Sequence, residues 1–263
     1  MDLGLAGKSY LVVGGTSGMG LATARVLADE GASVVIAGRN LERGQSIAEQ
    51  LSKETSGTVQ AVKADVSVEG DPERMLTEAV ALMGQLDGIA VLTGILGHSS
   101  GDITDSEWID VFRDVMLGSI RSVQAAVPHL LARGGTVVTT SAYSISAPEF
   151  HRVPYASMKA AVATFTKAFA KEYGPHKIRI NCVCPGAIET EPMTALRAPL
   201  AEQYGYTYDT AIERMMTEHW GLKVALGRPG KPEEVGELMA FLLSPKAGYL
   251  TGALINIDGG TDF

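Results

Sequence analysis

Tyr155 and Lys159 are the two residues of this chain whose types and spacing most clearly suggest chemistry. They stand four residues apart and therefore share one face if the segment is helical. An ammonium group beside a phenol favours the phenolate, so we expect the pKa of Tyr155 to lie below its usual value of about 10. Such a pair could give or take a proton near neutral pH.

A glycine-rich turn near the N-terminus offers a place for a dinucleotide. Gly14, Gly18 and Gly20 follow a short apolar run and precede a segment with helical periodicity. In such a turn the first glycine allows the tight bend, the second lets the backbone approach a pyrophosphate, and the third permits close helix–sheet contact. The N-terminal end of the helix favours phosphate. The alternative is an ordinary strand-to-helix turn, but the position at the first such junction favours nucleotide binding.

The end of the second apolar run bears on which dinucleotide would bind. Gly38 and Arg39 stand where a carboxylate would bind the ribose hydroxyls of NAD. No acid competes there, and Arg39 can pair with a 2′-phosphate, so we expect NADP to be preferred, with NAD possible. Arg39 could instead be a solvated loop residue. Asp65-Val66, after the third run, suits a contact to adenine, although an aspartate there could be an ordinary turn residue.

The elements that must position these groups alternate between strand-like and helical patterns. Apolar runs without polar alternation predict buried strands at 10–13, 33–37, 58–64, 88–92, 136–140, 178–183 and 253–257. Amphipathic periodicity and capping residues predict helices at 21–30, after Asn40, from Asp71, and at 107–132, 154–173 and 232–243. This order specifies an α/β fold with one doubly wound parallel sheet of about seven strands and helices on both faces. We expect a single domain over residues 1–263.

One stretch does not fit this alternation. Residues 189–226 form a long excursion between the sixth strand and the last helix, and excursions at the carboxyl ends of strands commonly hold the ligand. The stretch carries aromatic and methionine side chains, among them Tyr204, Tyr206, Tyr208, Met215, Met216, His219 and Trp220. Packing within a lid or an interface is the plainer interpretation. If these side chains face the site, the substrate is apolar and fairly large.

Composition argues against several other functions. Hydrophobic residues make up 46% of the 263 residues and charged residues 20%, as in ordinary globular proteins. The formal net charge of −8, without a run of Lys or Arg, argues against nucleic acid as a partner. No apolar stretch is long enough to cross a bilayer, and the N-terminus shows no secretory pattern. We therefore expect a cytoplasmic protein without membrane contact.

Cysteine and histidine spacing predicts no metal site. Cys182 and Cys184 form a C-x-C pair within an apolar run, which indicates a buried, reduced pair. The five histidines are scattered and show no paired spacing. His98 and His151 could line the mouth of the pocket, but a solvated loop is the simpler expectation for both.

Taken together, these motifs resemble the short-chain dehydrogenase/reductase family over nearly the whole chain. The residues that carry the resemblance are Gly14, Gly18 and Gly20, Asp65-Val66, Tyr155-x-x-x-Lys159, Arg179-x-Asn181, Pro185-Gly186-x-Ile188-x-Thr190, Gly227-Arg228-Pro229, Pro232-Glu233-Glu234-Val235, and Thr251-Gly252 with Asp258-Gly259-Gly260. The resemblance implies a Rossmann-type fold, hydride transfer at the nicotinamide of NAD(P) and a homotetramer. It also implies that Tyr155 exchanges a proton with the substrate while Lys159 holds the nicotinamide ribose.

The candidate cofactor-binding residues follow from the turn, the strand ends and the resemblance. They are Gly14, Thr16, Ser17, Gly18, Met19, Gly20, Arg39, Asp65, Val66, Gly94, Tyr155, Lys159, Pro185, Gly186, Ile188 and Thr190.

The chain departs from the family pattern at functional positions. The family's Asn-Asn-Ala-Gly after the fourth strand is Val91-Leu92-Thr93-Gly94, which keeps only the glycine that faces the cofactor. The asparagine usual on the next long helix falls at Val115, and the usual catalytic serine falls at Ala142. Ser141 is therefore our first candidate for the catalytic hydroxyl, and Ser144 is the second.

These observations predict an NAD(P)-dependent oxidoreductase that interconverts a secondary alcohol and a ketone, with Tyr155, Lys159 and Ser141 as its catalytic residues. Its partner is a small-molecule alcohol or ketone. The main alternative is a nucleotide-binding sensor or scaffold of the same fold, with a catalytic site weakened at Val115 and Ala142. A third possibility is dehydration or epimerisation with a recycled cofactor.

Overall fold

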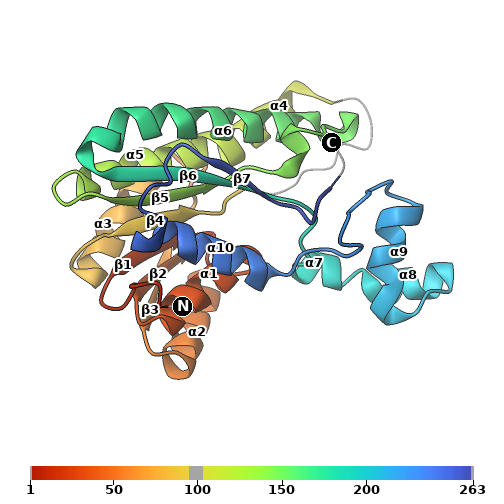
Figure 1. Ribbon diagram of the computed structural model, residues 1–263, viewed down its shortest axis with the longest axis horizontal. Helices are drawn as coiled ribbons and strands as arrows, with labels where there is room; N and C mark the ends of the chain where they lie inside the picture. Colours follow the sequence, from red (N-terminus) through yellow and green to blue (C-terminus); the bar gives the residue numbers. More distant parts are fainter. Residues whose placement is uncertain (1, 95–102, 262–263) are drawn as a thin grey trace.

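The computed structural model describes residues 2–94 and 103–261. Its centre is a parallel seven-stranded sheet with the strand order β3-β2-β1-β4-β5-β6-β7, shown edge-on in Figure 1. The strands are β1 (Ser9–Val13), β2 (Ser33–Gly38), β3 (Thr58–Lys63), β4 (Gly88–Val91), β5 (Gly135–Thr140), β6 (Ile178–Pro185) and β7 (Leu254–Ile257). The predicted strands, their parallel pairing and the doubly wound fold class are confirmed.

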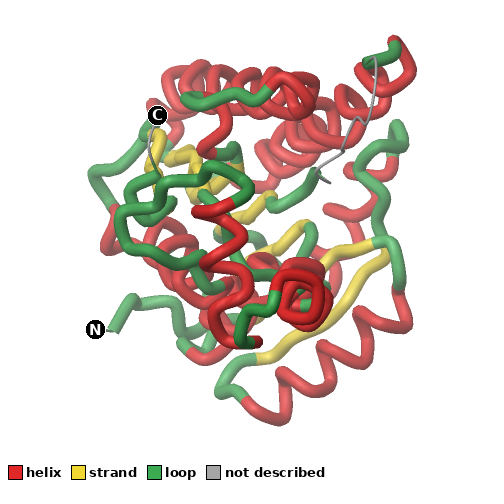
Figure 2. The backbone as a smooth tube through the Cα atoms, turned by 90° about the vertical axis from the view of Figure 1, so that its right-hand side faces the viewer, coloured by secondary structure: helices red, strands yellow, loops and turns green. Residues whose placement is uncertain are grey.

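Helices cover both faces of the sheet (Figures 1 and 2). They are α1 (Gly18–Asp29), α2 (Leu41–Glu54), α3 (Asp71–Met83), α4 (Asp105–Val111), α5 (Gly118–Leu130), α6 (Val153–Tyr173), α7 (Glu191–Thr194), α8 (Arg197–Tyr204), α9 (Ala211–Glu218) and α10 (Pro232–Leu243). Single helical turns occur at η1 (Phe112–Leu117), η2 (Tyr143–Ile145), η3 (Phe150–Arg152), η4 (Gly174–His176), η5 (Tyr208–Thr210) and η6 (Pro245–Ala247).

The core is divided by the sheet because successive side chains of a strand point to opposite faces. Tyr10 and Val12 of β1 pack with α1, α2 and α10, whereas Leu11 and Val13 pack with α3, α5 and α6. All five residues of β1 are buried, which explains why its sequence lacks the polar alternation of a half-exposed strand.

The strand order reverses beside β1, which pairs with β2 on one side and with β4 on the other. Connections leave these two neighbouring strands in opposite directions, so a crevice opens at their carboxyl ends. The glycine-rich turn follows β1 directly, and it therefore lies at the crevice. This topology, rather than the glycines alone, determines where a dinucleotide could lie.

The prediction of one long helix over 107–132 was wrong in one respect. The structure divides this stretch into α4, the π-helical turn η1 and α5. A capping box between Thr104 and Glu107 begins α4. Beside η1 the hydroxyl of Ser119 donates to the carbonyl of Val115 at 2.7 Å.

The excursion after β6 contains α7, α8, η5 and α9, none of which the sequence analysis placed. We call residues 191–222 the lid segment. Leu200, Ala211, Ile212 and Met216 form the buried centre of its own apolar cluster, separate from the two clusters on the sheet. Figure 1 shows α8 and α9 side by side, away from the sheet. Among the described helices, none has the length and apolar character needed to cross a membrane.

Candidate active site

The glycine-rich turn is packed so closely that side chains are excluded from it. A Cβ atom at Gly14, whose φ is +82°, would lie 2.6 Å from the carbonyl oxygen of Leu92. A Cβ atom at Gly20 would clash with the carbonyl of Gly14, and one at Gly18 would lie 3.0 Å from Thr190. Backbone N–H groups at the start of α1 are therefore open to a phosphate, as expected for a pyrophosphate cradle.

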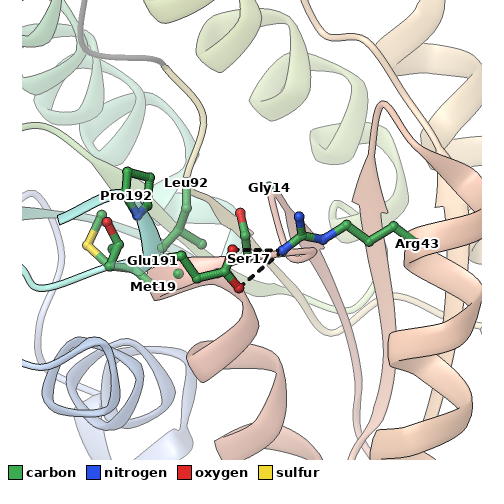
Figure 3. A pocket seen from close by; sticks show the side chains of 10 residues that line it. Gly14, Ser17, Met19, Arg43, Leu92, Glu191 and Pro192 are labelled. Carbon is green, nitrogen blue, oxygen red and sulfur yellow. Dashed lines mark hydrogen bonds and ion pairs between the residues drawn. The ribbon is translucent and has the colours of Figure 1, made fainter. Parts of the chain in front are cut away.

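A cavity of about 360 Å³ lies over this turn (Figure 3). Its lining residues are Gly14, Ser17, Gly18, Met19, Gly20, Arg43, Leu92, Thr190, Glu191 and Pro192. The volume is within the range of small-ligand sites. The structure thus brings five predicted residues of the turn together with Thr190, which the sequence places far away. The cradle and the cavity fit the phosphate-bearing part of a dinucleotide.

The predicted residues at the ends of β2 and β3 do not line this cavity. Arg39 is exposed just after β2 and forms no ion pair within the described residues. A Cβ atom at Gly38 would lie 2.8 Å from the Oγ1 atom of Thr16, so Thr16 packs directly against Gly38. Asp65 accepts hydrogen bonds from the backbone and the hydroxyl of Ser67, so its carboxylate also serves a local turn, as the alternative interpretation proposed.

Several predicted cofactor-binding residues serve as packing elements in this structure. Val66 is buried and lies against Gly118, where an added Cβ atom would be 2.6 Å from its Cγ2 atom. Gly186 packs on the backbone of Asp258, and Ile188 belongs to the core beneath α1 and α10. Pro185 ends β6. Of the motif after β6, Thr190 alone lines the cavity.

Tyr155 and Lys159 lie on α6, one turn apart, as the spacing predicts. The Lys159 Nζ atom is 5.6 Å from the centre of the Tyr155 ring. It donates to the backbone carbonyls of Thr93, at 3.0 Å, and Thr140, at 2.9 Å, which follow β4 and end β5. A Cβ atom at Gly94 would lie 3.3 Å from the same Nζ atom. Lys159 is therefore held at the carboxyl edge of the sheet, beside the expected glycine.

Burial shifts the pKa values of this pair toward their neutral forms. It raises the pKa of Tyr155 to about 12, and Arg152 offsets this only in part. It lowers the pKa of Lys159 to about 8. The expectation that the Tyr155 pKa lies below its usual value was wrong for this structure, because burial raises it and the charge that opposes burial comes from Arg152 rather than from Lys159.

The two candidate hydroxyls have different surroundings. Ser141 is buried, and its hydroxyl donates to the carbonyl of Lys159 at 2.8 Å. Its proton is thus already used to hold α6 against the end of β5. Ser144, in η2, is only 6% exposed, and its Oγ atom has no hydrogen-bond partner within the described residues. Buried hydroxyls are nearly always paired, so this oxygen is free for a ligand.

Val115 fills the position where the resemblance expects an asparagine. It is fully buried, and its Cγ2 atom would lie 3.1 Å from a Cβ atom at Gly94. It therefore closes the space beside the cofactor-facing glycine with an apolar group. The backbone carbonyl of Val115 accepts a hydrogen bond from the Ser119 hydroxyl. The hydroxyl oxygen of Ser119 lies 3.5 Å from the hydroxyl oxygen of Thr93. The hydroxyls of Ser119 and Thr93 thus lie near the position at which the family has the side-chain amide of an asparagine.

Sequence reasoning missed Arg43 and Glu191, which lie opposite each other across the cavity (Figure 3). The Arg43 Nη2 atom lies 3.0 Å from the Glu191 carboxylate. The sequence did contain one signal for Arg43. Asn40 caps α2 by accepting the backbone N–H of Arg43, and this places that arginine in the first turn beside the end of β2.

The remaining predicted residues give no sign of another site. Cys182 and Cys184 are free thiols and are buried, as predicted. The described residues contain no group of three metal-ligating side chains. His151 lies 3.4 Å from Glu149, and His98 lies outside the described residues.

Comparisons with known proteins agree with this geometry. A family model described as "Enoyl-(Acyl carrier protein) reductase" matches residues 13–262. The 3-oxoacyl-[acyl-carrier-protein] reductase FabG of Chlamydia muridarum is 34% identical over 259 residues, which cover 97% of this chain and 98% of that protein. Glucose 1-dehydrogenase of Gluconobacter oxydans is 31% identical over 258 residues, with 97% and 92% covered. This chain belongs to the short-chain dehydrogenase/reductase family.

A solved structure of the family gives the same fold. L-sorbose reductase from Gluconobacter frateurii, complexed with NADPH and L-sorbose, superposes with a TM-score of 0.91 at 27% identity, covering 99% of this chain and 98% of that one. Membership of the short-chain dehydrogenase/reductase family makes the chain an NAD(P)-dependent oxidoreductase, which confirms the sequence-based prediction at that level.

Proposed function

We propose that this short-chain dehydrogenase/reductase interconverts a ketone and a secondary alcohol, with Tyr155 as the proton donor and acceptor. The observation that carries the proposal is the Lys159 ammonium, buried one helical turn from Tyr155 and held by the carbonyls of Thr93 and Thr140. When bound, the nicotinamide supplies or accepts the hydride. The protein's task is then to place a carbonyl near Tyr155 and to neutralise the oxygen charge that develops.

The raised pKa of Tyr155, about 12, leaves the phenol in the protonated form that reduction requires. At neutral pH the buried phenol keeps its proton and is ready to donate it to a developing alkoxide. Oxidation of an alcohol would instead require the phenolate, which burial disfavours. Lys159 retains one N–H beyond its two carbonyl bonds, and we assign that donor to the ribose of the cofactor.

NADPH is the cofactor we propose to be preferred. Arg39 is exposed after β2 without an ion pair to the described residues, and Arg43, in the first turn of α2, lines the cavity. Two guanidinium groups near the end of β2 suit a 2′-phosphate, with no carboxylate at that strand end to favour NAD. The NADPH complex of L-sorbose reductase, a structural relative, agrees with this preference.

Ser144 is the hydroxyl that we now favour for binding the substrate oxygen. Ser141 donates its proton to the Lys159 carbonyl, whereas the buried Ser144 oxygen has no partner within the described residues. If Ser144 polarises the carbonyl, Ser144→Ala should lower kcat by roughly 100-fold, as for loss of one donor to a developing oxyanion. Ser141→Ala should instead lower thermal stability. If Ser141→Ala instead lost kcat strongly while Ser144→Ala did not, Ser141 would be the catalytic hydroxyl.

A second cavity of about 360 Å³ supports an assignment of the substrate pocket. It is lined by Tyr143, whose phenol interacts electrostatically with Tyr155, and by Glu149 and Lys223. An acid and a base at the wall suit a substrate with polar groups better than the apolar, fairly large one that the sequence suggested if the side chains of 189–226 face the site. The relatives that act on glucose and on sorbose are consistent with such a substrate.

The proposal is tested by measuring NADPH consumption against a panel of ketones, with Tyr155→Phe as the control. The variant keeps the ring but removes the proton, so turnover should fall at least 100-fold while NADPH still binds. Undiminished turnover in Tyr155→Phe would reject the assigned acid. NADPH binding without turnover on any ketone would favour the alternative, a nucleotide-binding sensor or scaffold.

We also propose that the protein assembles as a homotetramer in the cytoplasm. The edge strand β7 presents Leu254, which is 39% exposed, and the preceding loop presents Tyr249 and Leu250. Exposed apolar side chains beside an open strand edge suit contact with another copy of the chain. Light scattering during size-exclusion chromatography would report the assembly, and a monomer at micromolar concentration would contradict it.

A further inference from the structure

The ion pair between Arg43 and Glu191 crosses the cavity above the glycine-rich turn (Figure 3). The Arg43 Nη2 atom lies 3.2 Å from one carboxylate oxygen of Glu191 and 3.0 Å from the other. Arg43 belongs to the first turn of α2, and Glu191 is the first residue of α7. The pair therefore joins two elements that border the site of the cofactor phosphates.

A carboxylate at this position is unexpected beside a phosphate site. Glu191 lines the same cavity as Ser17 and Gly18, where the pyrophosphate would lie, and a negative charge there repels phosphate. Arg43 neutralises that charge and is itself the natural partner of a phosphate group. The Glu191 carboxylate and a cofactor phosphate can therefore both bind the guanidinium group of Arg43.

The pair is also weak enough to exchange. The Arg43 side chain is 47% exposed and that of Glu191 is 65% exposed. Solvent-exposed pairs of this kind contribute little stability, because water and salt screen them. Only one nitrogen of the guanidinium group contacts Glu191, so other N–H groups of Arg43 remain available to a second anion.

The lid segment begins at this pair. Within the described residues, Arg43–Glu191 is the one ion pair between residues 191–222 and residues 2–94. The lid segment has its own apolar cluster, and Arg197 holds α8 to Glu213 of α9. Arg197 also pairs with Glu189 and so keeps the segment attached to the end of β6. The segment can therefore shift as a unit about that attachment when its tie to α2 is lost.

We propose that Glu191 and the phosphate groups of the cofactor compete for Arg43, so that cofactor binding breaks the ion pair and releases α7 from α2. In the free protein Glu191 holds Arg43 and ties down the lid segment. In the complex Arg43 binds phosphate, and the lid segment is free to adjust to the substrate. The inference rests on the proposed binding of NADPH.

Two single variants give the competition a signature that a merely structural pair does not have. Glu191→Gln and Arg43→Gln both break the pair, so both should raise hydrogen–deuterium exchange in residues 191–222 without cofactor. Their NADPH affinities should change in opposite directions. Glu191→Gln removes the competing anion and should bind NADPH roughly two- to fivefold more tightly. Arg43→Gln loses a charge-assisted bond and should bind roughly tenfold more weakly.

Arg25→Gln is the matched control. Arg25 pairs with Glu54 at 2.7 Å, with both side chains about as exposed as Arg43, but the pair joins α1 to the end of α2 and does not line the cavity. Its loss should change neither the exchange of the lid segment nor the affinity for NADPH. NADH titrations then identify the phosphate. Arg43→Gln weakens NADPH alone if Arg43 binds the 2′-phosphate, and weakens both cofactors if it binds the pyrophosphate.

The inference is overturned if Glu191→Gln binds NADPH no more tightly than the wild type, or if Arg43→Gln binds both cofactors normally. It is also overturned if the exchange of the lid segment is the same in all three proteins. Absence of NADPH and NADH binding in the wild type would instead reject the proposed function itself. The two failures are therefore distinguishable.

Discussion

Lys159 owes its position to two backbone carbonyls rather than to a counter-ion. Its side chain is buried, and its Nζ atom donates to Thr93 and Thr140 at the carboxyl ends of neighbouring strands. Carbonyl dipoles stabilise the charged form less than a carboxylate would, so burial prevails and lowers the pKa of Lys159 to about 8. The charge of this lysine is therefore sensitive to pH close to neutrality.

This pKa predicts a limb in the pH profile of the reductive reaction. Lys159 is charged below pH 8 and loses its proton as the pH rises through about 8, whereas Tyr155, with a pKa of about 12, stays protonated throughout. If the charged form is required, kcat/KM should be level below pH 8 and fall about tenfold per unit above it. Lys159→Arg, which cannot deprotonate in this range, should lose that limb. A wild-type profile that is level to pH 10 would contradict the prediction.

At the residue scale, the sequence predicted what spacing within one element controls. Tyr155 and Lys159 were found because a helix brings residues four apart onto one face. The choice between Ser141 and Ser144 was not predictable, because it depends on whether a hydroxyl meets the Lys159 carbonyl, which follows from how α6 packs on β5. Glu191 lies 148 residues from Arg43, and no local pattern connects them.

Among the elements, the lid segment depends on one buried arginine. Arg197 of α8 donates to Glu189 at 2.7 Å and to Glu213 of α9 at 2.9 Å. It also donates to the carbonyls of Tyr208 and Asp209. The hydrogen bonds from Arg197 hold the pKa of Glu189 below its ordinary value. One guanidinium group thus joins the end of the β6 motif to both helices of the lid segment.

Replacing that arginine should loosen the lid segment without unfolding the sheet. In Arg197→Met the carboxylates of Glu189 and Glu213 lose their shared partner, and breaking a largely buried pair of this kind costs about 3–5 kcal/mol. Limited proteolysis should then cut within 191–222 much faster, while far-ultraviolet circular dichroism changes little. The matched control is Arg214→Met, whose exposed pair with Glu218 should matter little. Equal cleavage of both variants would contradict the role assigned to Arg197.

The predicted elements differ in how well local pattern specified them. The helix expected at 232–243 forms over those residues as α10, because a proline starts it and its apolar face packs on α1. The short helices were missed for different reasons. The α9 sequence does carry apolar residues at helical spacing, Ala211, Ile212 and Met216, whereas α8 lacks a clear apolar face and α7 is a single turn. The π-helical turn η1 interrupts a stretch whose apolar periodicity is continuous, so the pattern alone predicted one helix.

On the scale of the whole molecule, the candidate site draws on both halves of the sheet. The glycine-rich turn follows β1, whereas Lys159 is held between the ends of β4 and β5, and Thr190 follows β6. The reversal of strand order beside β1 brings these chain ends to one edge. The alternation of strands and helices was enough to predict that edge, because parallel strands all present their carboxyl ends there.

A ligand that contacts all these strand ends should stabilise the molecule as a whole. Binding to the native state alone adds about 2.7 kcal/mol at a concentration one hundred times Kd. For a domain of this size 1 kcal/mol corresponds to about 2–4 °C, so NADPH at that excess should raise Tm by roughly 5–10 °C. Tyr155→Phe should show the same increase in differential scanning fluorimetry, because the phenol proton serves the substrate. NADH at equal concentration should give a smaller increase, since the guanidinium groups of Arg39 and Arg43 then meet no 2′-phosphate. An increase that is equal for the two cofactors would show that these arginines do not distinguish them.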